Sequence, residues 1–222
     1  MELEKVTKAD RRRYDDACGA ALGMEYVGER WALLLMRELL LGPRRFGELR
    51  AGLPGISANV LTQRLAGLEA AGIVHRHRLP PPANVQVYEL TRWGYESEGV
   101  VLALAKWALR SPTHDPTLPF SAVSLMLSLK MLLVAERAGD WQAQVAFRFG
   151  DDGYVATLAE GALHVRRGQG VVDATLSGAP SAFLPVVYGG RPLATVAAIA
   201  VEGNRAIAER FTSLFRLPPK VE

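Results

Sequence analysis

Residues 56–68 read Ile-Ser-Ala-Asn-Val-Leu-Thr-Gln-Arg-Leu-Ala-Gly-Leu and predict a helix with two different faces. Ser57 is a favourable N-cap, and Ile56 before it is placed to pack on Leu61 as a hydrophobic staple. The three leucines recur at helical spacing and therefore share one face. The opposite face is short, polar and uncharged, with Arg64 at its flank, and it carries Asn59, Thr62, Gln63 and Ala66.

Two further helices are predicted immediately before this stretch. Residues 31–41 are apolar nearly all round, which is typical of a helix buried on most sides, and the Gly-Pro pair at 42–43 ends it. Residues 46–50 predict a short helix, which the glycine and proline within 52–54 stop. The order and spacing are those of a helix-turn-helix, in which the helix that begins after Ser57 is the second one.

A strand hairpin is predicted directly after this pair of helices. Residues 73–78 and 85–90 alternate in the manner of strands, and a proline-rich turn at 80–84 joins them. Because side chains alternate along a strand, Arg76 and Arg78 share one face and are placed to hold phosphate oxygens. Two strands joined by a rigid tip, after a candidate recognition helix, predict a wing.

The basic surplus of the chain lies in the same region. The whole chain has 26 basic and 23 acidic residues, and this net charge of +3 is too small to establish nucleic-acid binding by itself. Residues 44–92, however, contain seven arginines against three glutamates. Short polar side chains read base edges in a major groove, although each one singly is as compatible with plain exposed surface. The residues predicted to contact double-stranded DNA are Arg44, Arg45, Ser57, Asn59, Thr62, Gln63, Arg64, Arg76 and Arg78.

Four stretches in this order resemble the HxlR-type winged-helix transcriptional regulators: residues 27–35, 42–49, 56–65 and 88–94. The similarity covers residues 14–110. It implies a DNA-binding homodimer whose interface is formed by the first helix and by the helix after the wing. A helix from Thr91 to about Arg110 also contains the apolar run 100–107, which must bury against either a second domain or a second subunit.

Cysteine occurs once, at Cys18, so the residues of one chain offer no internal disulfide and no cysteine-based metal site. Several HxlR-type regulators carry a redox-active cysteine at this place. Arginines 11–13 precede Cys18, but Asp15 and Asp16 are closer in sequence and would raise its pKa. We favour a small buried residue over a redox sensor, because a free cysteine usually packs as a small hydrophobe.

The histidines do not predict a metal site. His75 and His77 share a strand face, but zinc requires three or four ligands and no third candidate lies near them in the sequence. We therefore expect phosphate or solvent contacts here, and neither a metal nor a cofactor. His114 and His164 have no evident partner.

A second domain is predicted after the proline-rich boundary at 111–119. A helix over 120–138, strand-like runs at 144–149, 153–158 and 162–167, and later helices indicate an α+β fold. The order resembles the sterol carrier protein fold, on residues 173–178, 201–203 and 211–215, across 119–218. That resemblance implies an apolar tunnel between sheet and helices that holds a lipid-like molecule. An ordinary packed core of the same residues is the alternative, because a sequence does not show a void.

The expected fold is thus a mainly α winged helix-turn-helix domain over 1–111 and an α+β sterol-carrier-like domain over 119–218. No catalytic constellation is visible, so we do not expect an enzyme. The apolar stretch 119–135 contains Lys130 and is shorter than the roughly 20 residues that a bilayer requires. Residues 1–5 lack the apolar stretch of a signal peptide, so we expect a cytoplasmic protein without a membrane partner.

The leading hypothesis is a dimeric, sequence-specific transcriptional regulator controlled by an apolar small molecule in its second domain. The alternative is a lipid-binding or carrier protein that uses the helix-turn-helix as an interaction scaffold. The polar face of the recognition helix and the arginines of the wing favour the regulator.

Overall fold

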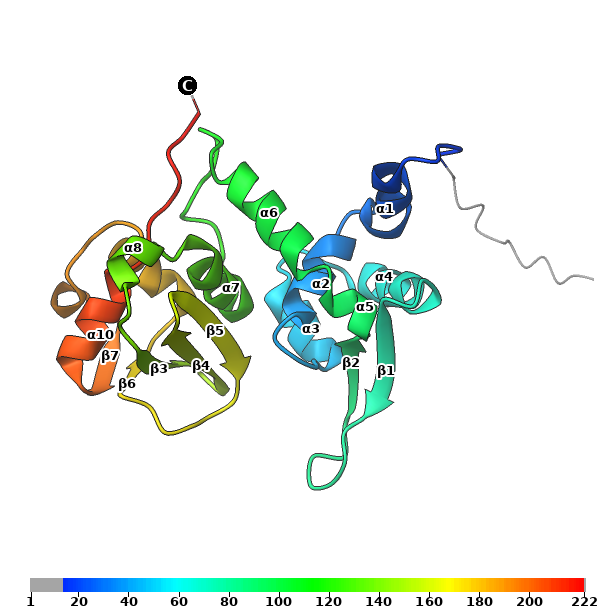
Figure 1. Ribbon diagram of the computed structural model, residues 1–222. Helices are drawn as coiled ribbons and strands as arrows, with labels where there is room; N and C mark the ends of the chain where they lie inside the picture. Colours follow the sequence, from blue (N-terminus) through cyan, green and yellow to red (C-terminus); the bar gives the residue numbers. More distant parts are fainter. Residues whose placement is uncertain (1–13, 222) are drawn as a thin grey trace, which may run out of the picture.

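The computed structural model describes residues 14–221, and Figure 1 shows two sheet-containing domains side by side. Arginines 11–13, considered above as neighbours of Cys18, lie outside the described residues. The first domain, called the winged-helix domain here, consists of α1 (Gly19–Val27), α2 (Ala32–Leu39), α3 (Phe46–Gly52), α4 (Ala58–Ala70), β1 (Val74–Arg78), β2 (Gln86–Leu90), α5 (Arg92–Tyr95) and α6 (Glu98–Ala108).

The helix boundaries of this domain follow local signals in the sequence. The Ser57 hydroxyl accepts a hydrogen bond from the backbone N–H of Val60 (3.3 Å), which confirms the N-cap of α4. The Thr91 hydroxyl likewise accepts from the N–H of Gly94 (3.1 Å) and starts α5. The single helix expected after Thr91 is divided into α5 and α6, with residues 96–97 between them.

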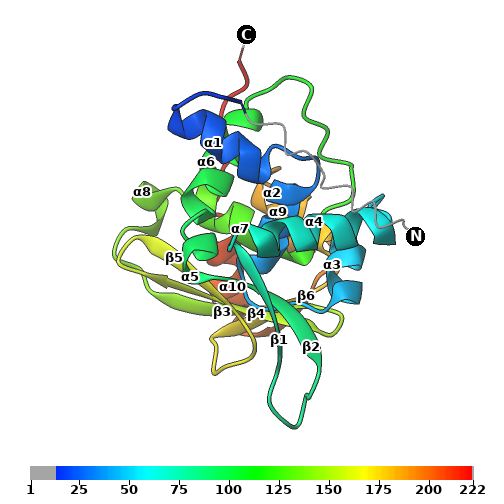
Figure 2. The ribbon, with the colours of Figure 1, turned by 90° about the vertical axis from the view of Figure 1, so that its right-hand side faces the viewer.

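The wing is a short antiparallel sheet. β1 pairs with β2, with Val74 opposite Leu90 at its base and Arg78 opposite Gln86 near its tip. Arg44, between α2 and α3, adds a third extended segment, since its backbone exchanges two hydrogen bonds with Tyr88 (2.9 and 2.8 Å). Figure 2 shows this hairpin projecting beyond the helices.

The C-terminal domain is a five-stranded sheet with helices packed on it, which confirms the α+β expectation. The strand order is β5-β4-β3-β6-β7, in which only the β3–β6 pair is parallel among the described strands. Its elements are α7 (Ala122–Leu132), α8 (Ala135–Ala138), β3 (Ala143–Phe149), β4 (Asp152–Ala159), β5 (Ala162–Arg167), β6 (Ala174–Ser177), η1 (Pro180–Phe183), α9 (Leu184–Val187), η2 (Leu193–Thr195), β7 (Ala200–Gly203) and α10 (Arg205–Thr212).

The helix expected over 120–138 is interrupted. Extended backbone at Leu133 and Val134 separates α7 from α8, and the N–H of Val134 donates to the carbonyl of Leu214 (2.8 Å). Leu133 also pairs with Phe215 in an isolated bridge. The interruption therefore joins this segment to the end of the chain, a long-range pairing that helical periodicity does not reveal.

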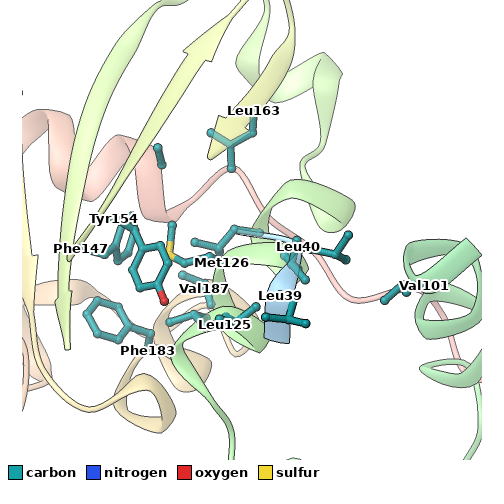
Figure 3. Close-up of a cluster of buried hydrophobic side chains, with 14 of the residues drawn as sticks. Leu39, Leu40, Val101, Leu125, Met126, Phe147, Tyr154, Leu163, Phe183 and Val187 are labelled. Atoms are coloured by element: carbon teal, nitrogen blue, oxygen red, sulfur yellow. The ribbon is translucent and has the colours of Figure 1, made fainter. Parts of the chain in front are cut away.

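Aromatic side chains fill the space between the sheet and its helices. Phe147 of β3 is fully buried between Phe183 (ring centroids 5.5 Å apart) and Phe211 (6.0 Å). Figure 3 shows Phe147, Phe183 and Tyr154 gathered in this core. This close packing of aromatic rings fits the packed core that was the alternative to a tunnel, and the tunnel itself stays a prediction.

The two domains share one buried hydrophobic cluster. Leu39 and Leu40 at the end of α2 lie next to Leu125 and Met126 of α7, as Figure 3 shows. Polar contacts border this junction: the Ser121 hydroxyl donates to the buried Glu38 carboxylate (2.7 Å). Lys130 of α7 also pairs with Glu98 of α6 (2.5 Å). The C-terminal domain is thus fixed against the winged-helix domain by apolar packing and by ionic contacts.

The end of the chain returns to the winged-helix domain. The Lys220 ammonium donates to the carbonyls of Leu109 (3.1 Å) and Ser111 (2.9 Å), just beyond the C-terminal end of α6. A cation at this end of a helix satisfies otherwise unpaired carbonyls. Among the described residues, 14–221, no helix is long and apolar enough to cross a membrane.

Candidate nucleic-acid interface

The recognition helix α4 presents the polar face predicted for it. Leu61, Leu65 and Leu68 are buried against the domain core. On the opposite face the side chains of Asn59 and Gln63 are exposed. Thr62 is exposed too, and its hydroxyl donates to the carbonyl of Ala58 (3.0 Å), so it offers mainly an acceptor and a methyl group outward. The leucine face therefore fixes the helix, and the uncharged face is left to meet a partner.

Arg64, at the flank of this face, is held within the domain. Its Nε donates to the carbonyl of Arg30 (3.1 Å), and its Nη2 pairs with Glu29 (2.8 Å). These contacts tie α4 to the loop before α2. The contact of Arg64 with DNA remains a prediction. Its guanidinium already binds the Arg30 carbonyl and the Glu29 carboxylate.

Arg44 and Arg45 point in opposite directions, because neighbouring side chains alternate along extended backbone. Arg45 is exposed at the start of α3. Arg44 is only 5% exposed and is turned into the junction with the C-terminal domain, so the expectation that it contacts DNA is wrong for this fold. Its guanidinium pairs with Asp152 of β4 (2.7 Å) and donates to the hydroxyl of Tyr154.

An ionic network surrounds Arg44 at the domain junction. Arg167 of β5 bridges Asp152 (2.5 Å) and Glu48 of α3 (2.9 Å), so one guanidinium binds acids from both domains. Burial would raise the pKa of Asp152, but hydrogen bonds and charge from Arg44 and Arg167 outweigh it and hold that pKa below its ordinary value. The pKa of Glu48 is lowered in the same way, against burial, by the Arg45 backbone N–H and by Arg167.

The wing arginines remain candidates for phosphate contact. Arg76 and Arg78 are exposed and lie on the same face of β1, as the alternation predicts. Nη1 of Arg78 donates to the carbonyl (3.0 Å) and the side-chain oxygen (3.2 Å) of Asn84 at the wing tip. This anchor holds the guanidinium near the wing tip, and its contact with phosphate remains a prediction.

The outer face of α6 is apolar and exposed. Val100, Leu104 and Trp107 follow one another at helical spacing, and the Trp107 side chain is 72% exposed. Val101, in the same apolar run, is buried within the chain. α1 also exposes apolar side chains, Leu22 and Met24, and it packs on α5 through the edge-to-face pair Tyr26–Trp93 (5.4 Å).

Cys18 is exposed at the N-cap of α1, so the expectation of a small buried residue is wrong. Its pKa is lowered, because the backbone N–H groups of Ala20 and Ala21 hydrogen-bond the thiolate at the start of the helix. This overturns the prediction that the nearby aspartates raise the pKa. The redox role of Cys18 stays a prediction.

The base of the wing brings together three side chains that can ligate a metal. His75 and His77 lie on the same face of β1, and Glu89 of β2 is directly opposite His75. Their ligand atoms all lie within 4.8 Å of one another. Glu89 is not among the ligands predicted from the sequence, because it lies across the hairpin from the histidines and not near them along the chain.

A cavity of about 1300 Å³ lies at the domain junction rather than inside the C-terminal domain. α6 and the segment 109–119 form one wall, and α7 and α9 form the other. Apolar side chains line it, including Leu102, Leu127 and Leu184. Ser128 and Tyr188, which also line it, share a hydrogen bond between their hydroxyls, and burial raises the pKa of Tyr188 above its usual range.

A helix-turn-helix followed by a two-stranded wing defines a winged helix-turn-helix protein. The chain belongs to the HxlR-like helix-turn-helix family, which it matches over residues 26–115. It is 35% identical over 95 residues to YybR of Bacillus subtilis (strain 168), named an uncharacterized HTH-type transcriptional regulator, covering 41% of this chain and 74% of that protein. It is 36% identical over 86 residues to YvaP of the same organism, with the same description, covering 38% of this chain and 79% of that protein. The structure of the redox regulator HypR in its oxidized form is 33% identical, with a TM-score of 0.38, covering 41% of this chain and 94% of that chain.

Proposed function

We propose that the chain is a homodimeric, sequence-specific DNA-binding transcriptional regulator. The observation that carries this proposal is the uncharged polar face of α4, which is exposed while the leucine face opposite is fully buried. Side chains of this kind hydrogen-bond base edges, whereas the arginines of the wing suit phosphates. Family membership supports the proposal, because the relatives above are named HTH-type transcriptional regulators.

The proposed contacts fall into two groups with different roles. Asn59 and Gln63 read bases, and the wing arginines fix the register on the backbone. The full proposed set differs from the sequence-based one by the loss of Arg44 and consists of Arg45, Ser57, Asn59, Thr62, Gln63, Arg64, Arg76 and Arg78.

The test is selection of bound genomic fragments, followed by measurement of affinity for the selected site and for random DNA. Gln63→Ala is expected to weaken binding to the selected site by about 1–3 kcal/mol and to relax base preference there. Gln169→Ala, the same substitution at an exposed position of the C-terminal domain, serves as the control and is expected to bind as the parent does. If Gln63→Ala also left both affinities unchanged, α4 would not be the reading helix.

The proposed dimer forms through α1 and α6. The exposed apolar face of α6 is the surface that a second copy would cover, since such contiguous patches commonly mark interaction sites. A winged-helix dimer presents two copies of α4 to one DNA duplex, so the spacing of the two helices sets which sites are bound.

The C-terminal domain is proposed to be a sterol-carrier-like sensor whose ligand occupies the cavity at the domain junction. The lining suits an apolar molecule with a hydrogen-bonding group, because it is mainly apolar and Ser128 and Tyr188 supply hydroxyls to it. One wall is α6, whose outer face is the proposed dimer surface. A ligand that binds one position of α6 better than another would therefore shift the spacing of the recognition helices.

Thermal shift against fatty acids, sterols and aromatic hydrophobes tests the cavity, and Leu184→Trp fills part of it. A ligand is expected to stabilise the parent but not Leu184→Trp, whereas Val171→Trp, at a fully exposed position, is expected to respond as the parent does. The same ligand is expected to change operator affinity by about 1–3 kcal/mol. Binding without an effect on DNA would refute the regulation, and no binding by any compound would refute the sensor.

A further inference from the structure

We propose that His75, His77 and Glu89 form a binding site for one divalent transition-metal ion, such as Zn²⁺, at the base of the wing. The register of the hairpin builds this site. His75 lies directly opposite Glu89, and His77 follows two residues later, on the same face of β1. Three side chains of ligating type are thereby held over one patch of a paired sheet, which fixes their backbones.

The ligand atoms converge on one point. Nε2 of His77 lies 2.8 Å from Oε2 of Glu89, and Nε2 of His75 lies 3.8 Å from the same oxygen. Nitrogen and oxygen ligands bound tetrahedrally to Zn²⁺ at about 2.0–2.2 Å are roughly 3.3–3.5 Å apart. One of the two observed separations is shorter and the other longer than this ligand–ligand distance. Small rotations of the three side chains would therefore bring the ligand atoms to the spacing that a bound ion requires.

The imidazole rings are arranged for a shared ligand. Their centroids are 4.9 Å apart and their planes differ by 22°, and the Nε2 atoms of both rings approach the same oxygen of Glu89. Two imidazoles and one carboxylate suit Zn²⁺, Co²⁺, Ni²⁺ or Cu²⁺, whereas Mg²⁺ and Ca²⁺ prefer sites made of oxygen ligands. All three side chains are partly exposed, so solvent can reach the ion and complete its coordination.

An outer hydrogen bond orients the carboxylate. The Tyr95 hydroxyl, from α5, donates to Oε1 of Glu89 (3.3 Å), which leaves Oε2 directed toward the histidines. Partners of this kind hold ligands in place at metal sites. Arg76 occupies the other face of β1, so an ion here leaves the surface proposed for phosphate contact uncovered.

The experiment uses the full chain without an affinity tag, in a Cys18→Ser background so that the exposed thiol does not bind metal. Calorimetric titration of the chelator-treated protein with Zn²⁺ at pH 7.5 is expected to show one ion per chain, and bound Co²⁺ is expected to show visible absorption from nitrogen and oxygen ligands. His75→Ala, His77→Ala and Glu89→Gln are each expected to abolish this binding or to weaken it at least roughly tenfold. Tyr95→Phe is expected to weaken it by about 10–100-fold while all three ligands remain.

His164→Ala is the matched control, because His164 is an exposed strand histidine in the C-terminal domain, and it is expected to bind Zn²⁺ as the parent does. Circular dichroism of each metal-free variant checks that the hairpin variants fold. The proposal is overturned if the parent takes up no stoichiometric Zn²⁺, if folded Glu89→Gln and His75→Ala bind as tightly as the parent, or if His164→Ala removes the binding. An ion-paired cluster without metal affinity would give the first of these results.

Discussion

Asp152→Asn is predicted to destabilise the chain by about 3 kcal/mol, because it removes the acid shared by two guanidinium groups at the domain junction. Asp152 accepts from Arg44 (2.7 Å) and from Arg167 (2.5 and 3.1 Å). Arg44 has almost no contact with solvent, so the substitution removes the carboxylate that pairs with its buried charge and leaves the neutral hydroxyl of Tyr154 beside it.

The magnitude follows from the burial of the partners. Removing one member of a buried ion pair costs about 3–5 kcal/mol. The low end applies here, because the Asp152 side chain is 25% exposed and asparagine can still accept a hydrogen bond. For a chain of this size, about 3 kcal/mol corresponds to a fall in Tm of roughly 6–12 °C.

Urea unfolding and calorimetry at pH 7.5 measure this effect. Asp151→Asn, at the exposed neighbouring position, is the matched control and is expected to stay within about 0.5 kcal/mol of the parent. A double-mutant cycle with Arg44→Met isolates the pair, and a coupling energy of about 1–3 kcal/mol is expected between contacting residues. If Asp152→Asn unfolded like Asp151→Asn and the coupling were near zero, the junction would depend on apolar packing alone, and the reasoning above would be refuted.

Three further outcomes are expected. The pKa of Asp152 is lowered in the folded state, so the stability that this carboxylate contributes is fully present above the ordinary carboxyl pKa of about 4. This contribution is lost as the pH falls through the folded pKa. The free energy of unfolding should therefore fall less steeply with decreasing pH in Asp152→Asn than in the parent. Leu104→Glu places a charge on the exposed face of α6, outside the cavity lining, and should yield monomers in sedimentation equilibrium. The control Val171→Glu should remain dimeric. If Leu104→Glu were dimeric, this face of α6 would not be the dimer interface. Arg76→Ala and Arg78→Ala should each weaken binding to all DNA sequences alike and should each reduce the slope of log affinity against log salt concentration by about one. If that slope were unchanged in the double variant, the wing would not be part of the DNA interface.

The winged-helix domain was predictable because its signals are local. The N-cap at Ser57, the leucine spacing of α4 and the alternation along β1 each act within a few residues, and the structure confirms all three. The proposed DNA contacts remain predictions, since they need a partner molecule to test them.

Arg44 shows where local reasoning fails. Its sequence neighbours place it beside Arg45 in a basic turn, and nothing within that turn distinguishes the two residues. Its ion pair is with Asp152, 108 residues further along the chain, and it depends on how the C-terminal domain packs against residues 43–48. Similarly, the break between α7 and α8 results from pairing with residues 214–215.

Glu89 is an intermediate case, because it could have been found from the sequence. With a turn at residues 80–84, antiparallel pairing places position 75 opposite position 89, as the structure shows. The predicted hairpin alone therefore brings a carboxylate across from the two histidines. The register of a short hairpin is set by its turn, so this inference needed no tertiary contact.

The apolar run of α6 has two faces that differ in what covers them. The apolar residues over 100–107 predict a buried helix. Because they lie on both sides of it, the sequence does not indicate which side packs on the second domain and which on a second subunit. In the structure, Val101 and Leu102 face the chain's own core and cavity. Val100 and Leu104 remain exposed on the other side. The C-terminal domain therefore covers the inner face of this helix, and a second copy of the chain is the partner proposed for its outer face.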